Sequence, residues 1–306
     1  MSDEPIPSRR SGGTQGLLGL RLLLIAAGIG WGATISFGKI AASGEAAPLA
    51  LAVWQLTLMV VLLATRNLAL RETLPLTRQA LFFYAGAGVL GAALPNTLSY
   101  WAIPHVPAGV VSITYALIPM MTYGLAFAVG QEAAARKRFF GMVFGLGAVI
   151  LLIGPNIGAA GSLKPFWMLI VLTSAFCYEC EGVFAAFAMP EGVNPLTLLF
   201  GMSIAGLLLA LPAVFVTGTG LDPTVLTGRE ALALLGATLM HLFAYSTLLL
   251  LIRRAGAVFA SQISYVVTFS GVLWGLVLFG EVHSGSVWIA MALALAGLAL
   301  VNPRKA

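Results

Sequence analysis

Two apolar stretches near the ends of the chain decide its fold class: LLGLRLLLIAAGIG at residues 17–30 and GSVWIAMALALAGLALV at residues 285–301. A transmembrane helix needs about 20 predominantly apolar residues, whereas the strands of a membrane β-barrel alternate apolar and polar side chains. Neither stretch alternates in this way. Because backbone polar groups in lipid must be satisfied within helices or a closed barrel, the sequence predicts an all-α integral membrane protein.

The composition of the whole chain agrees with this prediction. Of 306 residues, 59% are hydrophobic and 9% are charged, and the mean hydropathy is +0.98. Soluble proteins carry about 25% charged residues, so this composition argues against a water-soluble enzyme, a disordered chain and a nucleic-acid-binding domain. The net charge of +5 does not favour nucleic acid either, because the basic residues are spread over short loops rather than gathered on one face.

Ten transmembrane helices are expected, separated by breaks that mostly contain Pro or Gly, although only residues 253–255 separate the eighth from the ninth. Ten spans of about 20 residues use roughly two thirds of the chain. The polar segment 1–16 is expected to be a cytoplasmic tail rather than a cleaved signal peptide. The expected helices are 17–38, 48–66, 79–101, 105–129, 137–154, 165–187, 195–216, 230–252, 256–279 and 285–301.

The Lys and Arg residues predict the orientation of these helices. If the N-terminus is cytoplasmic and the spans alternate, 13 of the 16 basic residues lie inside, as the positive-inside rule requires. The three that fall outside are Lys39, Lys164 and Arg229. The sequence therefore predicts a multi-pass protein of the inner (plasma) membrane with both termini in the cytoplasm.

An internal repeat relates the two halves of the chain. The segment PAGVVSITYALIPMMTYGLAFAVGQE at 107–132 is similar to GAVFASQISYVVTFSGVLWGLVLFGE at 256–281, and an offset of 149 residues aligns Glu132 with Glu281. Each half holds five spans, and an odd number of spans gives the two halves opposite orientations in the membrane. The sequence thus predicts two inverted five-helix repeats. Their expected bounds are 17–155 and 165–303.

Short motifs lie at characteristic places along the chain, and the ending of the first half is repeated at the end of the second. They are Trp31-Gly32, Lys39, Pro48, Tyr100, Ala108 to Ser112, Pro119, Gly130-Gln131-Glu132, the Gly-rich span 141–154, Phe279-Gly280-Glu281 and the span 285–301. In these motifs the chain resembles the EamA-type transporters of the drug/metabolite transporter superfamily over nearly its whole length. The resemblance implies movement of small metabolites, often outward. The layout is similar to amino-acid and drug exporters, including the YddG type that handles aromatic amino acids.

Three ionisable residues lie within expected spans: Glu179, Glu181 and His241. A charged side chain at the centre of a span costs at least about 2.5 kcal/mol on insertion scales, so such residues tend to face the bundle interior and mark transport pathways. Glu181 shares a helix face with Tyr178 and Ser174, which favours it over Glu179 for a cavity. A histidine near a carboxylate can carry protons. The three are therefore proton-coupling candidates, with purely structural bonding as the alternative.

Polar and aromatic side chains form pairs three or four residues apart on several helix faces. A cavity lined by aromatic side chains with a few polar groups suits a small organic ligand, and aromatic faces suit cationic or planar groups. The alternative is that such side chains anchor helix ends at the membrane interface, which is preferred for Trp101, Trp167 and Trp288. The candidate substrate-binding residues are Trp31, Asn96, Tyr100, Ser112, Tyr115, Tyr178, His241, Tyr245, Gln262 and Tyr265.

Two prolines and two cysteines complete the candidates. Pro95 and Pro119 fall inside expected spans, where a proline removes a backbone hydrogen bond and kinks the helix, so each predicts either a gate or a fixed bend. Cys177 and Cys180 have the spacing C-x-x-C, but no second pair accompanies them in the sequence. We therefore expect no metal site and no cofactor.

These patterns predict a secondary transporter rather than an enzyme. The expected activity is export of small metabolites, such as aromatic or neutral amino acids, by alternating access, either proton-coupled or facilitative. An importer of a related solute and a drug or amine efflux carrier are the alternatives, and an integral-membrane enzyme is a third. The expected partners are a small-molecule substrate and the lipid bilayer, without nucleic acid. The sequence leaves the oligomeric state open, with a monomer as one option.

Overall fold

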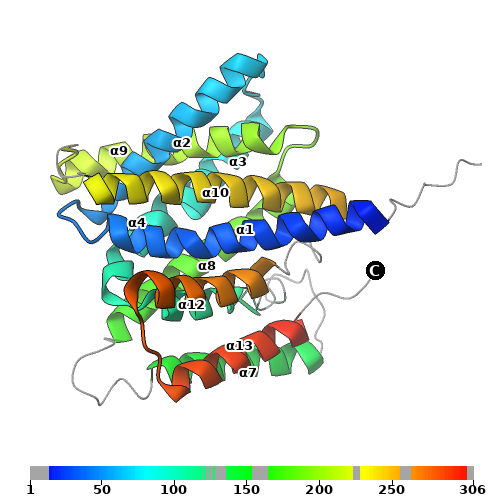
Figure 1. The fold of residues 1–306 in the computed structure, drawn as a ribbon. Coiled ribbons are helices and arrows are strands. Elements are labelled where there is room, and N and C mark those ends of the chain that lie inside the picture. Colours follow the sequence, from blue (N-terminus) through cyan, green and yellow to red (C-terminus); the bar gives the residue numbers. More distant parts are fainter. Residues whose placement is uncertain are drawn as a thin grey trace, which may run out of the picture.

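The computed structural model describes residues 14–118, 120–121, 124, 127, 136–153, 165–222, 228–255 and 263–301. Within these residues every regular element is a helix, and most helices run along one common direction (Figure 1). The elements are α1 (Thr14–Ala41), α2 (Pro48–Leu70), α3 (Arg78–Gly88), the π turn η1 (Val89–Ala93), α4 (Leu94–Ala102), the 3-10 turn η2 (Ile103–His105), α5 (Ala108–Tyr115), α7 (Arg136–Ile153), α8 (Pro165–Ala188), α9 (Pro195–Thr217), α10 (Gly228–Ala255), α12 (Ile263–Phe279) and α13 (Gly285–Val301).

Six of the described helices are long and apolar enough to cross a membrane. Three shorter apolar helices, of 10–17 residues, occupy the positions expected for the fifth, ninth and tenth spans. An all-helical chain with several membrane-spanning helices is therefore confirmed for the described residues. The count of ten spans and the inverted repeat stay predictions.

Prolines begin several of the helices. α2, α8 and α9 start at Pro48, Pro165 and Pro195, where the missing N–H costs nothing because the first turn of a helix has no internal acceptor for it. The side chain of Asn194 caps α9 by accepting a hydrogen bond from the backbone N of Leu196 at 3.0 Å. These starts coincide with breaks that the sequence itself marks.

The third expected span is a continuous helical run, Arg78–His105, with an irregular middle. The regular helix α3 passes into the π turn η1 at Val89–Ala93, and α4 begins one residue before Pro95. Pro95 has no N–H to donate to the preceding turn, and π turns inside α-helices occur frequently at functional sites. The backbone irregularity beside Pro95 is thus a π turn, and its role as a gate stays a prediction.

The fourth expected span, 105–129, is described only in part. α5 ends at Tyr115, and the amides of Ala116 and Leu117 donate to carbonyls three residues back, at 3.1 and 3.0 Å. This spacing is that of a tighter 3-10 helix. Pro119, the second expected kink, lies outside the described residues.

The helices pack in layers that Figure 1 shows from the side. α2, α3 and α9 form one side of the bundle, and α7 packs with α13 on the other. Between them, α1 lies against both α10 and α12, α4 lies against α8, and α12 packs on α5. The N-terminal end of α1 and the C-terminal end of α13 lie at the same end of the bundle.

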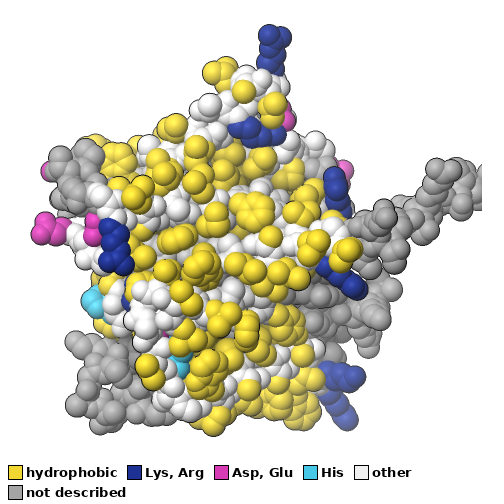
Figure 2. Space-filling model, in the orientation of Figure 1, with side chains coloured by type: hydrophobic (Ala, Val, Ile, Leu, Met, Phe, Trp, Pro, Cys, Tyr) yellow, Lys and Arg dark blue, Asp and Glu magenta, His cyan; other side chains and the backbone are white. Residues whose placement is uncertain are grey.

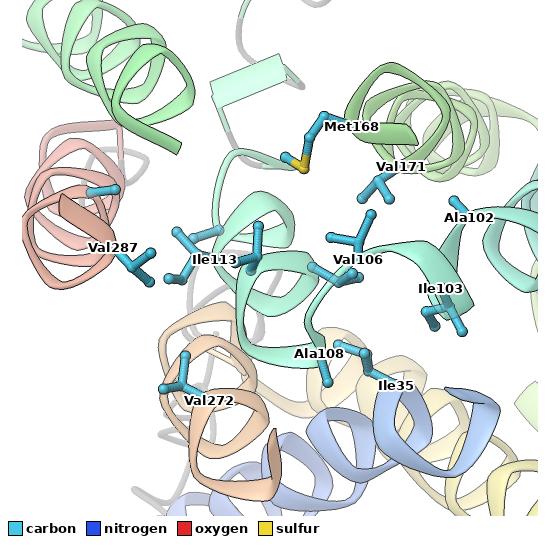
Figure 3. Packing of buried hydrophobic residues seen from close by; sticks show 14 of the residues in the cluster. Ile35, Ala102, Ile103, Val106, Ala108, Ile113, Met168, Val171, Val272 and Val287 are labelled. Atoms are coloured by element: carbon cyan, nitrogen blue, oxygen red, sulfur yellow. The ribbon is translucent and has the colours of Figure 1, made fainter. Parts of the chain in front are cut away.

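Small aliphatic side chains fill the space where these layers meet. Figure 3 shows a cluster to which α1 contributes Ile35, the turn before α5 contributes Val106, and α12 contributes Val272. Met168 from α8 and Val287 from α13 close it from the other side. This core joins helices from both halves of the chain.

The outer face of the bundle is apolar. Large hydrophobic side chains such as Leu208, Phe215 and Val277 are more than 60% exposed. Figure 2 shows hydrophobic side chains across the middle of one face, with Lys and Arg at its margins. Soluble monomers rarely expose such continuous apolar surface, so this face fits a lipid environment.

A carboxylate ties the end of α2 to the start of α9. The two Glu72 oxygens accept hydrogen bonds from Arg66 at 2.8 and 2.9 Å, from Thr197 at 2.7 Å and from Asn194 at 3.1 Å. The hydrogen bonds from Arg66 and Thr197 lower the pKa of Glu72 from 4.5 to about 2, because they favour the charged carboxylate. This cluster joins the two halves at a helix end.

Candidate functional site

Three polar side chains form one stripe along α8, and all three hydrogen-bond to neighbouring helices. Ser174, Tyr178 and Glu181 are separated by four and three residues, so they share a helix face. The Tyr178 hydroxyl donates to Oδ1 of Asn96 on α4 at 2.7 Å. The Tyr245 hydroxyl on α10 donates to Oε1 of Glu181, also at 2.7 Å. The stripe therefore links helices α4, α8 and α10 through buried polar contacts.

Three aromatic rings cluster at the Glu181 end of the stripe, where Tyr245 contacts the carboxylate and the other two rings pack on Tyr245. The ring of His241 stacks on that of Tyr245, with centroids 5.9 Å apart and planes 16° from parallel. The Trp31 ring on α1 lies 6.1 Å from His241 and 6.3 Å from Tyr245. The result is a carboxylate beside stacked aromatic rings, contributed by three helices. Such a group suits a ligand that carries both an ammonium and an apolar or aromatic part.

The π turn lies directly against this carboxylate. A Cβ placed on Gly91, in η1, would lie 2.7 Å from Cγ of Glu181 and 2.9 Å from Cδ. Such a distance is shorter than real Cβ contacts, so only glycine fits here without a shift of the Glu181 side chain. The irregular segment of the third span therefore packs on the central acidic residue.

A second polar group extends the stripe beyond Ser174. The Ser99 hydroxyl lies 2.8 Å from the Ser174 hydroxyl and 3.2 Å from the Tyr115 hydroxyl. Ser174 also donates to the backbone carbonyl of Pro95 at 2.9 Å. Tyr115 thus lies at the other end of the same stripe, on α5. Ser99 escaped the sequence prediction, although it is three residues from Asn96 and shares its face.

Other candidates lie away from this group. The Tyr100 hydroxyl donates to Oε1 of Gln55 on α2 at 3.1 Å, so Tyr100 faces α2 rather than α8. The Ser112 hydroxyl donates to the carbonyl of Ala108 within α5, and its side chain packs against Gly271 of α12. Tyr265 packs against a separate apolar cluster around Met120. Gln262 and Pro119 are outside the described residues.

The remaining residues of interest on α8 do not join the stripe. Glu179 is buried, but it lies two residues before Glu181 and therefore about 200° around the helix. Cys177 and Cys180 are free thiols rather than a disulfide. Among the described residues, no group of three or more His, Cys, Asp or Glu side chains could hold a metal ion.

A groove of about 540 Å³ lies apart from the polar stripe. Its lining is mostly apolar and comes from α7, α8 and the segment after α5, and it includes no member of the stripe. The polar groups of the stripe, by contrast, are hydrogen-bonded to side chains and backbone of α4 and α10. We regard the stripe as the candidate site, because its buried polar groups join α8 to α4 of the first half and α10 of the second. The lining residues of the groove are Met120, Met121, Gly124, Met142, Leu172, Thr173 and Phe176.

In the comparison with known proteins, each half of the chain matches the same family of proteins. The sequence profile of the EamA-like transporter family matches residues 19–154 and again residues 165–302. A solved crystal structure is similar in fold, with a TM-score of 0.62 and 17% sequence identity, over 92% of this chain and 96% of the other. At that identity the likeness shows the fold alone. No curated protein sequence matches the chain.

Proposed function

Because the chain belongs to the EamA-like transporter family, it is a membrane transporter of small solutes, and we propose that it exports small metabolites, such as aromatic or neutral amino acids, by alternating access. The observation that carries this proposal is the Glu181 carboxylate beside the rings of Trp31, His241 and Tyr245. In the proposed orientation the termini are cytoplasmic and the protein lies in the inner membrane.

The pattern of helix packing supports two inverted repeats. If α1 to α7 form one repeat and α8 to α13 the other, α1 is the counterpart of α8, and α10 is the counterpart of the α3–α4 run. α1 packs on α10 and α12, and correspondingly α8 packs on α4 and α5. The pairs α2 with α9, α5 with α12 and α7 with α13 each join a helix to its own counterpart. A two-fold relation between the halves accounts for all of these pairs.

The candidate site follows the same relation. Asn96 and Tyr245 are 149 residues apart, which is the repeat offset found in the sequence. Trp31 and Tyr178 are 147 residues apart, which is the offset between the prolines that start α2 and α9. Trp31 contacts Tyr245, and Tyr178 contacts Asn96. These two contacts are therefore equivalent under the repeat. The site lies where inverted-repeat carriers hold their substrates, between the two halves.

The proposed substrate uses both parts of the site. Its ammonium group pairs with Glu181 after displacing or sharing the Tyr245 hydroxyl, which now occupies Oε1 at 2.7 Å. An aromatic or aliphatic side chain packs on Trp31 and His241, since aromatic pairs and cation–π contacts both favour such surfaces. Amino acids of the aromatic and neutral classes, as in YddG-type exporters, meet these demands. Organic amines also meet them, which makes an amine efflux carrier the second candidate.

Glu181, Glu179 and His241 are the proposed proton-coupling residues. A buried carboxylate that binds either a proton or a substrate ammonium can exchange one for the other, because the two cations compete for the same oxygens. Glu181 is the first choice of the three, since its oxygen contacts the aromatic group directly. Pro95 and its π turn are the proposed flexible element beside it.

The decisive experiment is transport by purified protein in proteoliposomes. We would offer a panel of aromatic and neutral amino acids and a panel of organic amines, each with and without an imposed proton gradient. Glu181→Gln and His241→Ala would be compared with the wild type. Glu191→Gln, on an exposed turn, is the matched control for loss of a carboxylate.

We expect saturable movement of amino acids that Glu181→Gln abolishes and Glu191→Gln leaves intact. Loss of only the gradient-driven part would support proton coupling at Glu181, while normal transport by Glu181→Gln would make this carboxylate structural. Movement of amines alone would favour the second candidate. Failure to move any amino acid by folded protein would refute the amino-acid proposal, and counterflow in both orientations would separate export from import.

A further inference from the structure

Another largely enclosed carboxylate, that of Glu281, lies just beyond the C-terminal end of α12. Glu281 follows the end of α12, and its Oε1 accepts from the backbone N of Ala108 at 2.7 Å while its Oε2 accepts from the N of Gly109 at 3.1 Å. Ala108 and Gly109 begin α5, whose first N–H groups have no partner within the helix. A carboxylate at this position is further favoured by the helix dipole.

Three glycines make this contact possible, one by its backbone conformation and two by leaving space. Gly280 adopts a positive φ of 61°, and Glu281 N donates back to the Gly275 carbonyl at 3.4 Å, so the chain folds over the end of α12. A Cβ on Gly275 would lie 2.6 Å from Oε2 of Glu281, and a Cβ on Gly109 would lie 2.6 Å from Nε2 of His283. The Glu281 carboxylate and the His283 ring therefore occupy space that a larger residue at Gly275 of α12 or Gly109 of α5 would fill.

Lys39 supplies the opposite charge from α1. Its Nζ lies 3.1 Å from Oε1 of Glu281, also donates to the Val106 carbonyl at 3.1 Å, and lies 5.0 Å from the Phe279 ring centre. Nε2 of His283 lies 3.6 Å from the other carboxylate oxygen, Oε2 of Glu281. The Glu281 side chain is 9% exposed and the Lys39 side chain 20% exposed, so water screens this pair only weakly.

We propose that the Lys39–Glu281 ion pair is a latch that closes the outer end of the transport path. It joins α1 and the start of α5, from the first half, to α12, from the second half. In alternating access the two halves separate at one end while they close at the other. These three segments cannot separate at this end while Glu281 holds both Lys39 and the α5 amides. This inference rests on the proposed alternating-access function, and it concerns residues that are distant from Glu181.

Ser36 offers a reporter directly beneath the latch. It is three residues before Lys39 on α1 and shares its face, it is fully buried, and its hydroxyl has no hydrogen-bond partner among the described residues. In a background where Cys177 and Cys180 are replaced by Ala, Ser36→Cys would be modified with a charged thiol reagent. Purified protein in detergent micelles is used, so the reagent reaches both ends and no substrate is needed.

Lys39→Met is the central variant, because it removes the ion pair but leaves Glu281 able to cap α5. Glu45→Gln, exposed in the loop after α1 at the same end, is the control. We expect Lys39→Met to raise the modification rate of Cys at position 36 about tenfold over the control, a ratio within the usual range of coupling between sites. Equal rates in Lys39→Met and Glu45→Gln would overturn the latch.

Glu281→Gln separates a latch from a simple helix cap. A cap alone would lower the apparent Tm of Glu281→Gln without changing the modification rate in either variant, and that result would overturn the proposal. If the Ser36→Cys protein does not fold, hydrogen exchange at the Ala108 and Gly109 amides serves instead. These amides should exchange faster in Lys39→Met than in Glu45→Gln, and equal exchange would refute the latch. Neither readout uses a substrate, so both remain valid if the amino-acid proposal fails.

Discussion

The crossing of α3 and α9 allows a stability prediction to be worked from backbone distances. A Cβ on Gly88 would lie 2.7 Å from the backbone N of Gly206, 2.8 Å from the carbonyl O of Met202 and 2.9 Å from Cβ of Ala205. Ordinary contact begins at 3.4 Å, so Gly88→Ala requires a separation of about 0.7 Å. Backbone atoms cannot rotate away as a flexible side chain can. Close packing of this kind is what small residues provide between transmembrane helices.

Overpacking of a well-packed contact costs about 1–3 kcal/mol. At about 2–4 °C per kcal/mol for a chain of this size class, Gly88→Ala should lower the apparent Tm by roughly 2–12 °C. Gly182→Ala is the matched control, because nothing lies within 4 Å of a Cβ at that position on α8. Its effect should be neutral or slightly stabilising, since alanine favours a helix over glycine.

Both variants would be melted in the same detergent at the same heating rate, and their transport would be measured in proteoliposomes. The reasoning is refuted if Gly88→Ala melts at or above the temperature of Gly182→Ala. Such a result would mean that α3 and α9 do not approach each other as closely as the structure has them.

Two further predictions concern single polar contacts. The stabilising effect of Glu72 is complete above its unfolded pKa of 4.5 and is lost as the pH falls toward its folded pKa of about 2. Glu72→Gln should therefore melt below the wild type at pH 7, with a difference that shrinks between pH 4.5 and 2; a difference that does not depend on pH would contradict this. Tyr245→Phe keeps the ring but loses the donor to Glu181, and a hydrogen bond to a charged group contributes about 1.5–3 kcal/mol. Because the proposed substrate ammonium has to displace or share this hydroxyl, the substrate concentration for half-maximal transport should fall, by up to about 10- to 100-fold, and should change much less for Tyr178→Phe, whose partner Asn96 is neutral; equal effects would argue against a special role for Glu181.

The helices could be predicted closely, because apolar runs and prolines mark both their length and their starts. Differences arise where tertiary contacts extend a helix past its apolar run. The second helix was expected to end at residue 66 but continues to Leu70, since Arg66 and Asn67 find partners around Glu72 instead of facing lipid. A hydropathy pattern does not predict which polar side chain will meet another after folding.

Side chains on one helix face could be predicted, but their partners could not. The stripe of Ser174, Tyr178 and Glu181 follows from helical spacing alone. Asn96 and Tyr100 were expected to line one cavity because they are four residues apart, yet one bonds to α8 and the other to α2. Positions four apart differ by about 40° around a helix, which is enough to reach two different neighbours.

The latch shows the same limit more sharply. Lys39 and Glu281 are 242 residues apart in the sequence, and neither segment contains a pattern that predicts contact with the other. The sequence contained only the repeated Glu at the ends of two similar segments. Which backbone amides and which lysine that glutamate meets depends on how the two halves are packed.

The π turn in the third span has a consequence for the energetics of the whole transport cycle. In the proposed inverted repeat its counterpart is α10, which is α-helical throughout its 28 residues, the same length as the run Arg78–His105. A carrier built from two identical inverted halves would have end states of equal free energy, because a two-fold rotation about an axis in the membrane plane would turn one state into the other. A backbone irregularity in one half alone lifts that degeneracy. Without substrate or gradient, the protein should therefore rest with one side preferred, a bias encoded in five residues of backbone.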